Sequence, residues 1–148
     1  MVCLGNICRS PMAEGIMRLK IKKYKLAATV DSAGTSSYHQ GEHPDKRSIL
    51  SGEKHGVDIS NLVSRPFIAN DFEQFDVIYA MDSENMNNII QLAGNENNRE
   101  KVKLILNEIY PSTNKAVPDP YFGGEYDFEI VFSLLDEACE VIAKKINR

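Results

Sequence analysis

The opening stretch MVCLGNICRSPMAEG (1–15) decides the fold that we expect for this chain. Val2-Cys3 is typical of the end of a strand. Ser10-Pro11 is typical of the start of a helix, with the serine as N-cap and the proline as the first helical residue. Residues 3–10 are therefore predicted to form a loop that leads from a strand into a helix N-terminus.

The rest of the chain alternates between short apolar runs and stretches with a helical pattern. Runs rich in branched residues and bounded by turn residues predict strands over Ala28–Ser32, Phe75–Met81 and Lys101–Leu106. Helices are predicted over Pro11–Tyr24, Pro44–His55, Ser83–Leu92 and Tyr126–Ile146. The last helix has a predicted buried face of apolar residues at helical spacing: Phe128, Phe132, Leu135, Cys139, Ile142 and Ile146.

Strands that alternate with helices indicate an α/β fold, a doubly wound parallel sheet with helices on both faces. Such sheets bind ligands beyond the carboxyl ends of their strands, and the opening loop is expected there. The sequence has no internal repeat, low-complexity tract or linker, so we expect a single domain over residues 1–148.

Composition excludes several classes of function. With 43% hydrophobic and 26% charged residues, the 148-residue chain can form one domain with a core. Its net charge of −4 gives no general attraction to nucleic acid or to an anionic membrane surface. No apolar stretch approaches about 18 residues, and the start lacks the pattern of a signal peptide. We therefore expect a cytoplasmic protein, and a monomer.

The opening loop has the residue types needed to bind and attack a phosphoryl group. Gly5 and Asn6 tolerate left-handed backbone angles, so successive amide N–H groups can turn toward one oxyanion, aided by the helix dipole. These amides and Arg9 favour the thiolate form of Cys3, the candidate nucleophile. Arg9 can bind two phosphoryl oxygens through its planar guanidinium. No Gly-Lys-Ser/Thr triplet follows, which excludes a Walker phosphate loop.

Ser10 allows two interpretations at the end of this loop. As the residue before a proline at a helix start, it fits a simple N-cap. Its hydroxyl can also donate a hydrogen bond toward the Cys3 sulfur. Both interpretations are retained at this point.

A candidate general acid lies in the segment VPDPYFGG (117–124). Prolines on both sides stiffen the backbone around Asp119, and two glycines end the turn. Tyr121 and Phe122 are expected to form an apolar wall that excludes water and keeps the acid protonated at mildly acidic pH. Alone this segment would be an ordinary Asp-Pro turn, but beside the opening loop Asp119 is the candidate for protonating a leaving group.

Four segments resemble the low-molecular-weight protein tyrosine phosphatase family, in the order CLGNICRSPMAEG, DSAGTSSY, AMDSEN and PDPYFGG. The resemblance covers essentially the whole chain and implies a flavodoxin-like three-layer αβα fold with a four-stranded parallel sheet. It implies Cys3 as nucleophile, Arg9 as phosphate clamp and transition-state stabiliser, and Asp119 as general acid and then base. It also implies a phosphocysteine intermediate, and no metal or other cofactor.

The expected substrate is a phosphotyrosine protein or a small aryl phosphate, with inorganic phosphate as a product. A phenol leaves more easily than an alkyl alcohol because the phenol has the lower pKa, about 10. Tyr38 and Tyr121 are candidate walls of an aromatic slot, although either could be a surface tyrosine. Substrate binding is assigned to these two tyrosines and to six loop residues, namely Leu4, Gly5, Asn6, Ile7, Cys8 and Ser10.

Three other functions are compatible with parts of this sequence. Arsenate reductases share the loop but need further resolving cysteines in the second half of the chain, where only Cys139 lies. Protein-arginine phosphatases characteristically have threonine where Ile7 stands. A non-catalytic phosphotyrosine-binding module has no need for a leaving-group acid such as Asp119. Phosphotyrosine hydrolysis is therefore the favoured prediction.

Two segments depart from the family pattern. The first strand normally runs several residues before the nucleophile, whereas Met1 and Val2 alone precede Cys3 here. We expect either that translation begins further upstream, which is favoured, or that the domain tolerates a short strand and leaves backbone groups of its neighbours unpaired. The segment Asn61–Pro66 lacks the usual Ala-Arg-Gln triplet, which affects local loop contacts rather than the catalytic set.

The remaining thiols and the histidines have separate interpretations. Many family members carry a second thiol at the position of Cys8, which either packs as a small apolar side chain or forms a reversible disulfide with Cys3. Cys139 is predicted to lie in the core. His39, His43 and His55 form no zinc-ligand spacing with the cysteines, so no metal site is expected.

Overall fold

The computed structural model describes residues 1–148. Its elements are β1 (Val2–Cys3), α1 (Arg9–Tyr24), β2 (Ala33–Gly34), α2 (Lys46–Lys54), α3 (Asp71–Gln74), β3 (Ile78–Ala80), α4 (Ser83–Ile90), α5 (Glu96–Glu100), β4 (Val102–Leu104), the 3₁₀ helix η1 (Ile105–Glu108) and α6 (Glu125–Ile146). The strands form one parallel sheet in the order β2-β1-β3-β4, and Val2 lies opposite both Ala33 and Ala80. The predicted α/β fold with a four-stranded parallel sheet is confirmed.

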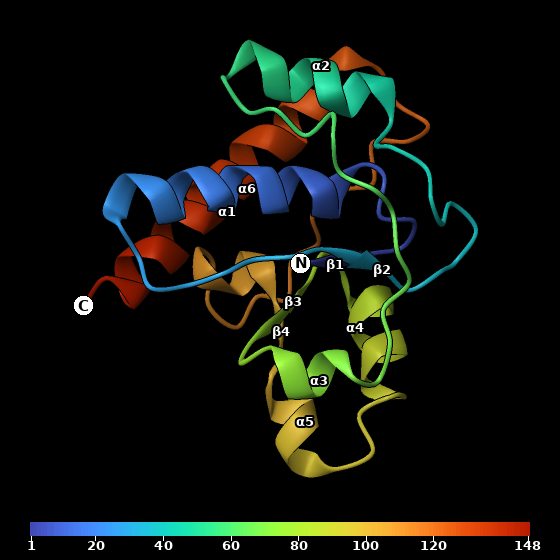
Figure 1. Cartoon of the computed structure of the whole chain (residues 1–148), viewed down its shortest axis with the longest axis vertical. Coiled ribbons are helices and arrows are strands. Elements are labelled where there is room, and N and C mark those ends of the chain that lie inside the picture. Colours follow the sequence, from blue (N-terminus) through green and yellow to red (C-terminus); the bar gives the residue numbers. More distant parts are fainter.

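Helices cover both faces of this sheet. Figure 1 shows α1, α2 and α6 on one side of the strands and α3, α4 and α5 on the other. Side chains alternate between the two faces along a strand, so Cys3 packs with buried residues of α1 and α6, while Val2 packs with Phe72 of α3 and Ile89 of α4. The two buried clusters hold β1 in the middle of the sheet, which fixes the start of the loop that follows it.

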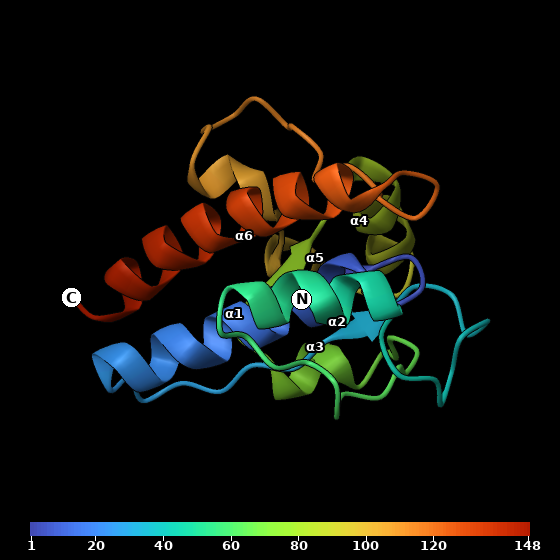
Figure 2. The same ribbon diagram turned by 90° about the horizontal axis from the view of Figure 1, so that it is seen from above.

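Helices α1 and α6 lie side by side over one face (Figure 2). The predicted apolar face of α6 is buried as expected, including Cys139, except at Ile146. The prediction for Ile146 is wrong because this residue lies in the last turn of α6, where its side chain is exposed. Burial raises the pKa of the Cys139 thiol to about 12. None of the helices combines the length and the apolar composition needed to cross a membrane.

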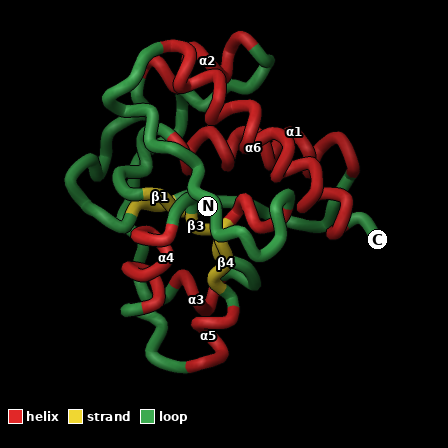
Figure 3. Tube along the Cα trace, turned by 180° about the vertical axis from the view of Figure 1, so that it is seen from behind, coloured by secondary structure: helices red, strands yellow, loops and turns green.

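The strands are short compared with the helices (Figure 3). The predicted strand over Ala28–Ser32 is wrong, because β2 pairs only at Ala33 and Gly34, opposite Val2 and Cys3. No backbone N–H or C=O group of residues 27–30 makes a hydrogen bond within the chain. These groups lie at a largely apolar groove of about 490 Å³ between residues 27–33 and 74–79.

The other predicted elements differ from the structure mainly at their ends. Strand β3 lies in the second half of the predicted segment 75–81. The prediction of strand at Ile105 and Leu106 is wrong, because the chain turns there into η1. The predicted helices correspond to α1, α2, α4 and α6, with ends that differ by a few residues. Helices α3 and α5 were not predicted, since four or five residues are too few to show an apolar period.

Candidate active site

A pocket of about 440 Å³ lies beyond the carboxyl end of β1, where a parallel sheet binds its ligands. The loops after β1 and β2 and the loop before α6 surround it. It is lined by Cys3, Leu4, Gly5, Ile7, Cys8, Arg9, Ser36, Tyr38, His39, Asp119, Tyr121 and Phe122. The pocket thus brings together all the predicted site residues except Asn6 and Ser10, which are buried. No group of three or more His, Cys, Asp or Glu side chains is placed to hold a metal ion.

Two hydrogen-bond donors surround the sulfur of Cys3. The backbone N–H of Asn6 donates to Sγ at 3.3 Å, and Ser10 Oγ lies 3.0 Å from the same atom. A thiolate only accepts hydrogen bonds, so with Cys3 ionised the Ser10 hydroxyl donates. The interpretation of Ser10 as a partner of Cys3 is confirmed. Its prediction as N-cap is wrong, because α1 begins at Arg9 with Cys8 in the cap position.

The buried side chain of Asn6 fixes the shape of the loop through hydrogen bonds to three other residues. Its backbone is left-handed, with φ of 56°, as its residue type allows. Its Nδ2 donates to Ser10 Oγ at 2.7 Å and to Ser32 Oγ at 3.0 Å, and its Oδ1 accepts from the N–H of Arg65 at 3.1 Å. Ser32 in turn donates to Glu14 Oε1 at 2.7 Å. Asn6 donates both amide protons, so Ser10 Oγ accepts from Asn6, and its own proton faces two acceptors, Cys3 Sγ at 3.0 Å and the Ala33 carbonyl at 3.3 Å.

Glu14 is the buried end of this hydrogen-bond chain. Desolvation by burial raises the pKa of its carboxyl above the usual range, while the hydrogen bond from Ser32 opposes that rise. Arg18, one turn further along α1, forms an ion pair with the other carboxylate oxygen. The Ser32 hydroxyl donates to Glu14, and Asn6 Nδ2 donates to Ser32 and to Ser10, so a continuous set of hydrogen bonds links Glu14 to the residue that contacts the Cys3 sulfur.

Several backbone amides of the loop that contains Cys3 have no partner within the chain. The N–H groups of Leu4, Gly5, Ile7 and Cys8 make no hydrogen bond within the chain, although they lie directly before the N-terminus of the 16-residue helix α1. Unpaired N–H groups at a helix N-terminus bind anions, because the helix dipole adds to their partial positive charge. The loop therefore has the donors expected of an oxyanion cradle.

Gly5 serves this loop in a different way from the one predicted. Its φ is not positive, and Asn6 alone takes the left-handed conformation in the loop. A Cβ atom at position 5 would lie 3.0 Å from Cδ2 of His39, which is tighter than ordinary packing. The glycine therefore leaves room for the His39 ring, which a larger residue would have to displace.

Arg9 is held in place by groups from two other parts of the chain. Its Nη1 donates to Asp82 Oδ2 at 2.7 Å and to the carbonyl of Val117 at 3.0 Å, and the guanidinium is almost fully buried. Asp82 follows β3 and caps α4 through a 2.8 Å hydrogen bond from Asn85 N–H to its Oδ1. Arg9 Nη2 lies 3.8 Å from Asp119 Oδ2, so the guanidinium reaches the pocket.

Asp119 is positioned by its own turn and stays open to solvent. Its Oδ1 accepts a hydrogen bond from the N–H of Tyr121 at 3.1 Å, and its side chain is 47% exposed. The predicted apolar wall is not formed, because Phe122 is 96% exposed and Tyr121 is 40% exposed. The turn directs both side chains toward solvent at the margin of the pocket rather than over the acid.

Tyr38 lies in the loop after β2 and lines the pocket. It is 85% exposed and contacts the His39 ring edge to face, with centroids 4.8 Å apart. Tyr38 and Tyr121 thus both line the pocket, and their rings also remain accessible to solvent.

The chain matches the model of the family described as low molecular weight phosphotyrosine protein phosphatase over residues 1–148. It belongs to this family. A low molecular weight phosphotyrosine protein phosphatase of Schizosaccharomyces pombe is 43% identical over 148 residues, covering 98% of this chain and 94% of the relative. The predicted resemblance is confirmed.

Solved structures of this phosphatase fold are also similar to the chain. Vibrio vulnificus Wzb, in complex with benzylphosphonate, has 31% identity and a TM-score of 0.87, and the match covers 97% of this chain and 94% of that one. DARP, a Drosophila arginine phosphatase, has 32% identity and a TM-score of 0.89, with 97% and 94% covered. The match to both structures includes almost the full length of each chain.

Cys8 is a buried free thiol in this member of the family. It packs with Ile7 and Phe128, and burial raises the pKa of its thiol well above the ordinary value. These contacts favour the interpretation as a packed apolar side chain. A disulfide between Cys8 and Cys3 stays a prediction.

Sequence reasoning missed several residues that build the phosphatase site. Asp82 was not recognised as the partner of Arg9, although its place before a helix is a readable N-cap signal. His39 and Ser36 line the pocket without any local motif that marks them. Ser32, just before β2, and Glu14 of α1 are brought together by tertiary contact, which no short segment encodes.

Proposed function

We propose that this chain is a cysteine-dependent protein tyrosine phosphatase that hydrolyses phosphotyrosine or a small aryl phosphate and releases inorganic phosphate. The observation that carries the proposal is the meeting of Cys3, Arg9 and Asp119 in one pocket. The unpaired loop amides supply donors for phosphoryl oxygens, and the buried guanidinium of Arg9 supplies a fixed positive charge.

In the first step, the thiolate of Cys3 attacks phosphorus, and the bond between phosphorus and the phenolic oxygen breaks. Asp119 gives its proton to the departing oxygen, so tyrosine leaves as a neutral phenol and a phosphocysteine remains. The 3.8 Å between Arg9 Nη2 and Asp119 Oδ2 supports these roles, because a phosphoryl group bound by Arg9 has its leaving oxygen close to the acid.

In the second step, Asp119 is a carboxylate and takes a proton from water as the water oxygen attacks phosphorus. The bond between phosphorus and sulfur breaks, which releases phosphate and restores the thiolate of Cys3. The Ser10 hydroxyl and the Asn6 N–H, at 3.0 and 3.3 Å from the sulfur, stabilise the departing thiolate.

The substrate contacts follow from the lining of the pocket. Backbone amides of Leu4, Gly5, Ile7 and Cys8 bind the phosphoryl oxygens, while Asn6 and Ser10 act from beneath by holding the loop and the sulfur. The rings of Tyr38 and Tyr121 flank the aryl group. The benzylphosphonate complex of the similar Vibrio protein supports an aryl ligand for this fold.

The net charge and the residues of the site bear on the partners, the cellular location and the cofactors of the protein. A net charge of −4 supports a protein that acts on neither nucleic acid nor a membrane surface. We propose that it acts as a monomer. We place the protein in the cytoplasm, and we propose that its chemistry uses neither metal nor other cofactor.

The second candidate substrate is phosphoarginine, because the similar Drosophila protein is an arginine phosphatase. Ile7 lines the pocket at the position where those enzymes characteristically carry threonine, and its apolar side chain favours an aryl group. An arsenate reductase is disfavoured because Cys139 is fully buried and cannot serve as a resolving thiol. A non-catalytic binding module is disfavoured because Asp119 is placed beside Arg9.

A side-by-side assay tests the function. Purified protein is given a phosphotyrosine peptide, a phosphoarginine peptide of the same sequence, and arsenate with thioredoxin, each with and without a metal chelator. We expect the phosphotyrosine peptide to be the fastest substrate, chelator to have no effect, and Cys3→Ser to abolish turnover. A faster phosphoarginine reaction would replace the substrate assignment. An unchanged rate in Cys3→Ser would overturn the mechanism.

A further inference from the structure

The N-terminus of α2 connects the two loops that carry the proposed chemistry. The backbone N–H of Asp45, the N-cap of α2, donates to the carbonyl of Ile7 in the phosphate-binding loop at 2.8 Å. Two residues later, Arg47 donates from Nη2 to the carbonyl of Tyr121 at 2.9 Å and from Nη1 to the carbonyl of Gly123 at 3.2 Å. One helix start therefore contacts both loops.

Asp45 also fixes the orientation of the Arg47 guanidinium. Its Oδ1 accepts from Nε of Arg47 at 3.0 Å, and its Oδ2 accepts from Nη2 at 2.9 Å. The side-chain hydrogen bonds from Arg47 lower the pKa of the Asp45 carboxyl, so this partner stays ionised. A two-point ion pair of this kind holds a planar guanidinium in one geometry even though the Arg47 side chain is 41% exposed.

Aromatic rings contact the same guanidinium. Its Cζ lies 4.8 Å from the centroid of the Phe128 ring, in the first turn of α6, and 5.6 Å from the centroid of the Tyr121 ring. Cation–π contacts within about 6 Å are attractive. Arg47 therefore holds Tyr121 both by its carbonyl and by its ring.

The position of Tyr121 matters because it holds the proposed acid. Asp119 Oδ1 accepts the backbone N–H of Tyr121 at 3.1 Å, and this is the only hydrogen bond that the Asp119 carboxyl makes. A path of direct contacts thus runs from Ile7 through Asp45, Arg47 and Tyr121 to Asp119.

We propose that Arg47 is a positioning residue for leaving-group protonation: it holds the Asp119 turn at a fixed distance from the phosphate-binding loop. The proposal rests on the proposed function, with Cys3 as nucleophile and Asp119 as acid. Arg47 touches neither the phosphoryl group nor the reacting atoms in this role. Lysine cannot replace it, because a single ammonium lacks the fork that binds a carboxylate and two carbonyls together.

The test compares Arg47→Ala and Arg47→Lys with the unchanged protein on aryl phosphates whose leaving groups range from nitrophenols to tyrosine. We expect kcat/KM for the tyrosine phosphate peptide to fall about tenfold in both variants, a fraction of the 10²–10⁴ that a general acid contributes. The esters with the most acidic leaving groups should change less than about twofold, since they leave without a proton. Equal losses on all esters would overturn the proposal.

A matched control and a double variant separate this role from a purely structural one. Lys46→Ala removes the same charge from the same turn of α2 without touching the acid loop, and it should leave every ester unchanged. In an Asp119→Ala background, Arg47→Ala should cost nothing further on any ester, because its effect passes through Asp119. A full additional tenfold loss in that background would overturn the proposal. If Asp119→Ala itself shows no leaving-group dependence, the proposed function fails instead.

Discussion

A single carboxylate, that of Asp82, orients Arg9 and caps helix α4. Its Oδ2 accepts the 2.7 Å hydrogen bond from Arg9 Nη1, and its Oδ1 accepts the N–H of Asn85 at 2.8 Å. Arg9 belongs to the helix that follows β1, while Asp82 follows β3, which is the next strand in the sheet. The pairing of these strands therefore places the guanidinium over the pocket before any substrate arrives.

This relationship makes Asp82→Asn a selective test of Arg9 orientation. The amide keeps an oxygen to cap α4 but loses the negative charge opposite Arg9. We expect kcat/KM on a phosphotyrosine peptide to fall about 10- to 100-fold, the equivalent of the ~1.5–3 kcal/mol typical of a hydrogen bond to a charged group. Steady-state kinetics and thermal unfolding check this. Asn95→Ala, which removes the N-cap of α5 away from the site, should lower stability slightly and leave kcat/KM unchanged.

Asp119→Ala tests the acid directly. Without a proton donor, hydrolysis of a phosphotyrosine peptide should slow by about 10²- to 10⁴-fold, whereas a dinitrophenyl phosphate should lose far less, because its leaving group needs no proton. The measurement is kcat/KM on both esters with the same preparation. Losses of the same size on the two esters would remove Asp119 from the acid role.

Asn6 offers a pair of variants that separates backbone strain from hydrogen bonding. Asn6→Ala loses the side-chain bonds to Ser10, Ser32 and Arg65 and must hold alanine at a φ of 56°. Asn6→Gly loses the same bonds without the conformational cost. We expect the alanine variant to be less stable than the glycine variant by about 1–2 kcal/mol, as the left-handed region costs a residue with Cβ. Denaturant unfolding measures the difference, and equal stabilities would show that the loop does not retain this conformation.

Acid should weaken the contact between α1 and α6 through Glu140. Lys20 Nζ lies 2.8 Å from Oε2 of Glu140, and the Tyr24 hydroxyl donates to Oε1. The contact with Lys20, followed by that with Tyr24, lowers the pKa of Glu140 from an ordinary value of 4.5 to about 2. A folded-state pKa below the unfolded value gives stability that is present above the unfolded pKa and is lost as pH falls through the folded pKa. The window is therefore from about pH 4.5 down to about pH 2.

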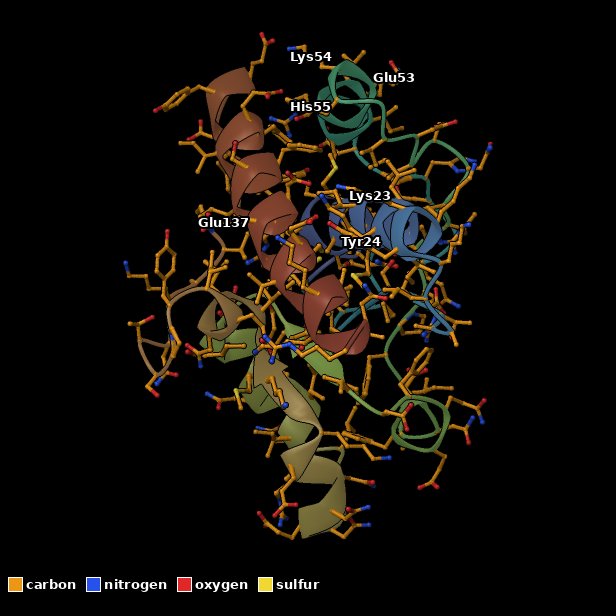
Figure 4. All side chains as sticks on the ribbon, turned by 90° about the vertical axis from the view of Figure 1, so that its left-hand side faces the viewer. Lys23, Tyr24, Glu53, Lys54, His55 and Glu137 are labelled. Atoms are coloured by element: carbon orange, nitrogen blue, oxygen red, sulfur yellow. The ribbon has the colours of Figure 1, made fainter.

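Glu140→Gln checks this window. The difference in free energy of unfolding between the unchanged protein and the variant should be constant above about pH 5 and shrink toward pH 2, because the carboxylate contribution is lost there. Glu137→Gln is the matched control, since Glu137 is exposed on α6, on the other side of its ribbon from Tyr24 (Figure 4). A difference that stays constant throughout this range would contradict the assignment.

The features that could be predicted from the sequence are those that depend on residues close together in the chain. The loop from Cys3 to Ser10 connects a strand to a helix, and the apolar period of α6 is visible along 22 residues. The strand expected at Ala28–Ser32 was displaced because strand position depends on the partner strand, and β1 pairs at Ala33 and Gly34. Asp82 and Glu14 were not predicted as site residues, because only contacts between separate elements bring them to the phosphate-binding loop.

The Asp119 turn shows a different limit. Its prolines predicted a stiff turn, and the bond from Tyr121 N–H to Asp119 agrees with that prediction. The direction of the Tyr121 and Phe122 rings was not predictable, because it depends on how the loop packs on α2 through Arg47. In the structure the Phe122 ring lies in solvent. Arg47 itself lies in no motif, and only the packing of α2 against α6 reveals its contacts.

In the proposed mechanism the phosphoryl group passes through the sulfur of Cys3. The most direct measurement is a rapid acid quench of the protein during turnover of an aryl phosphate, followed by mass spectrometry of the peptide that contains the opening loop. We predict one phosphoryl group on Cys3, and none in Cys3→Ser. Steady turnover with unmodified Cys3 at every quench time, and undiminished turnover in Cys3→Ser, would contradict the account.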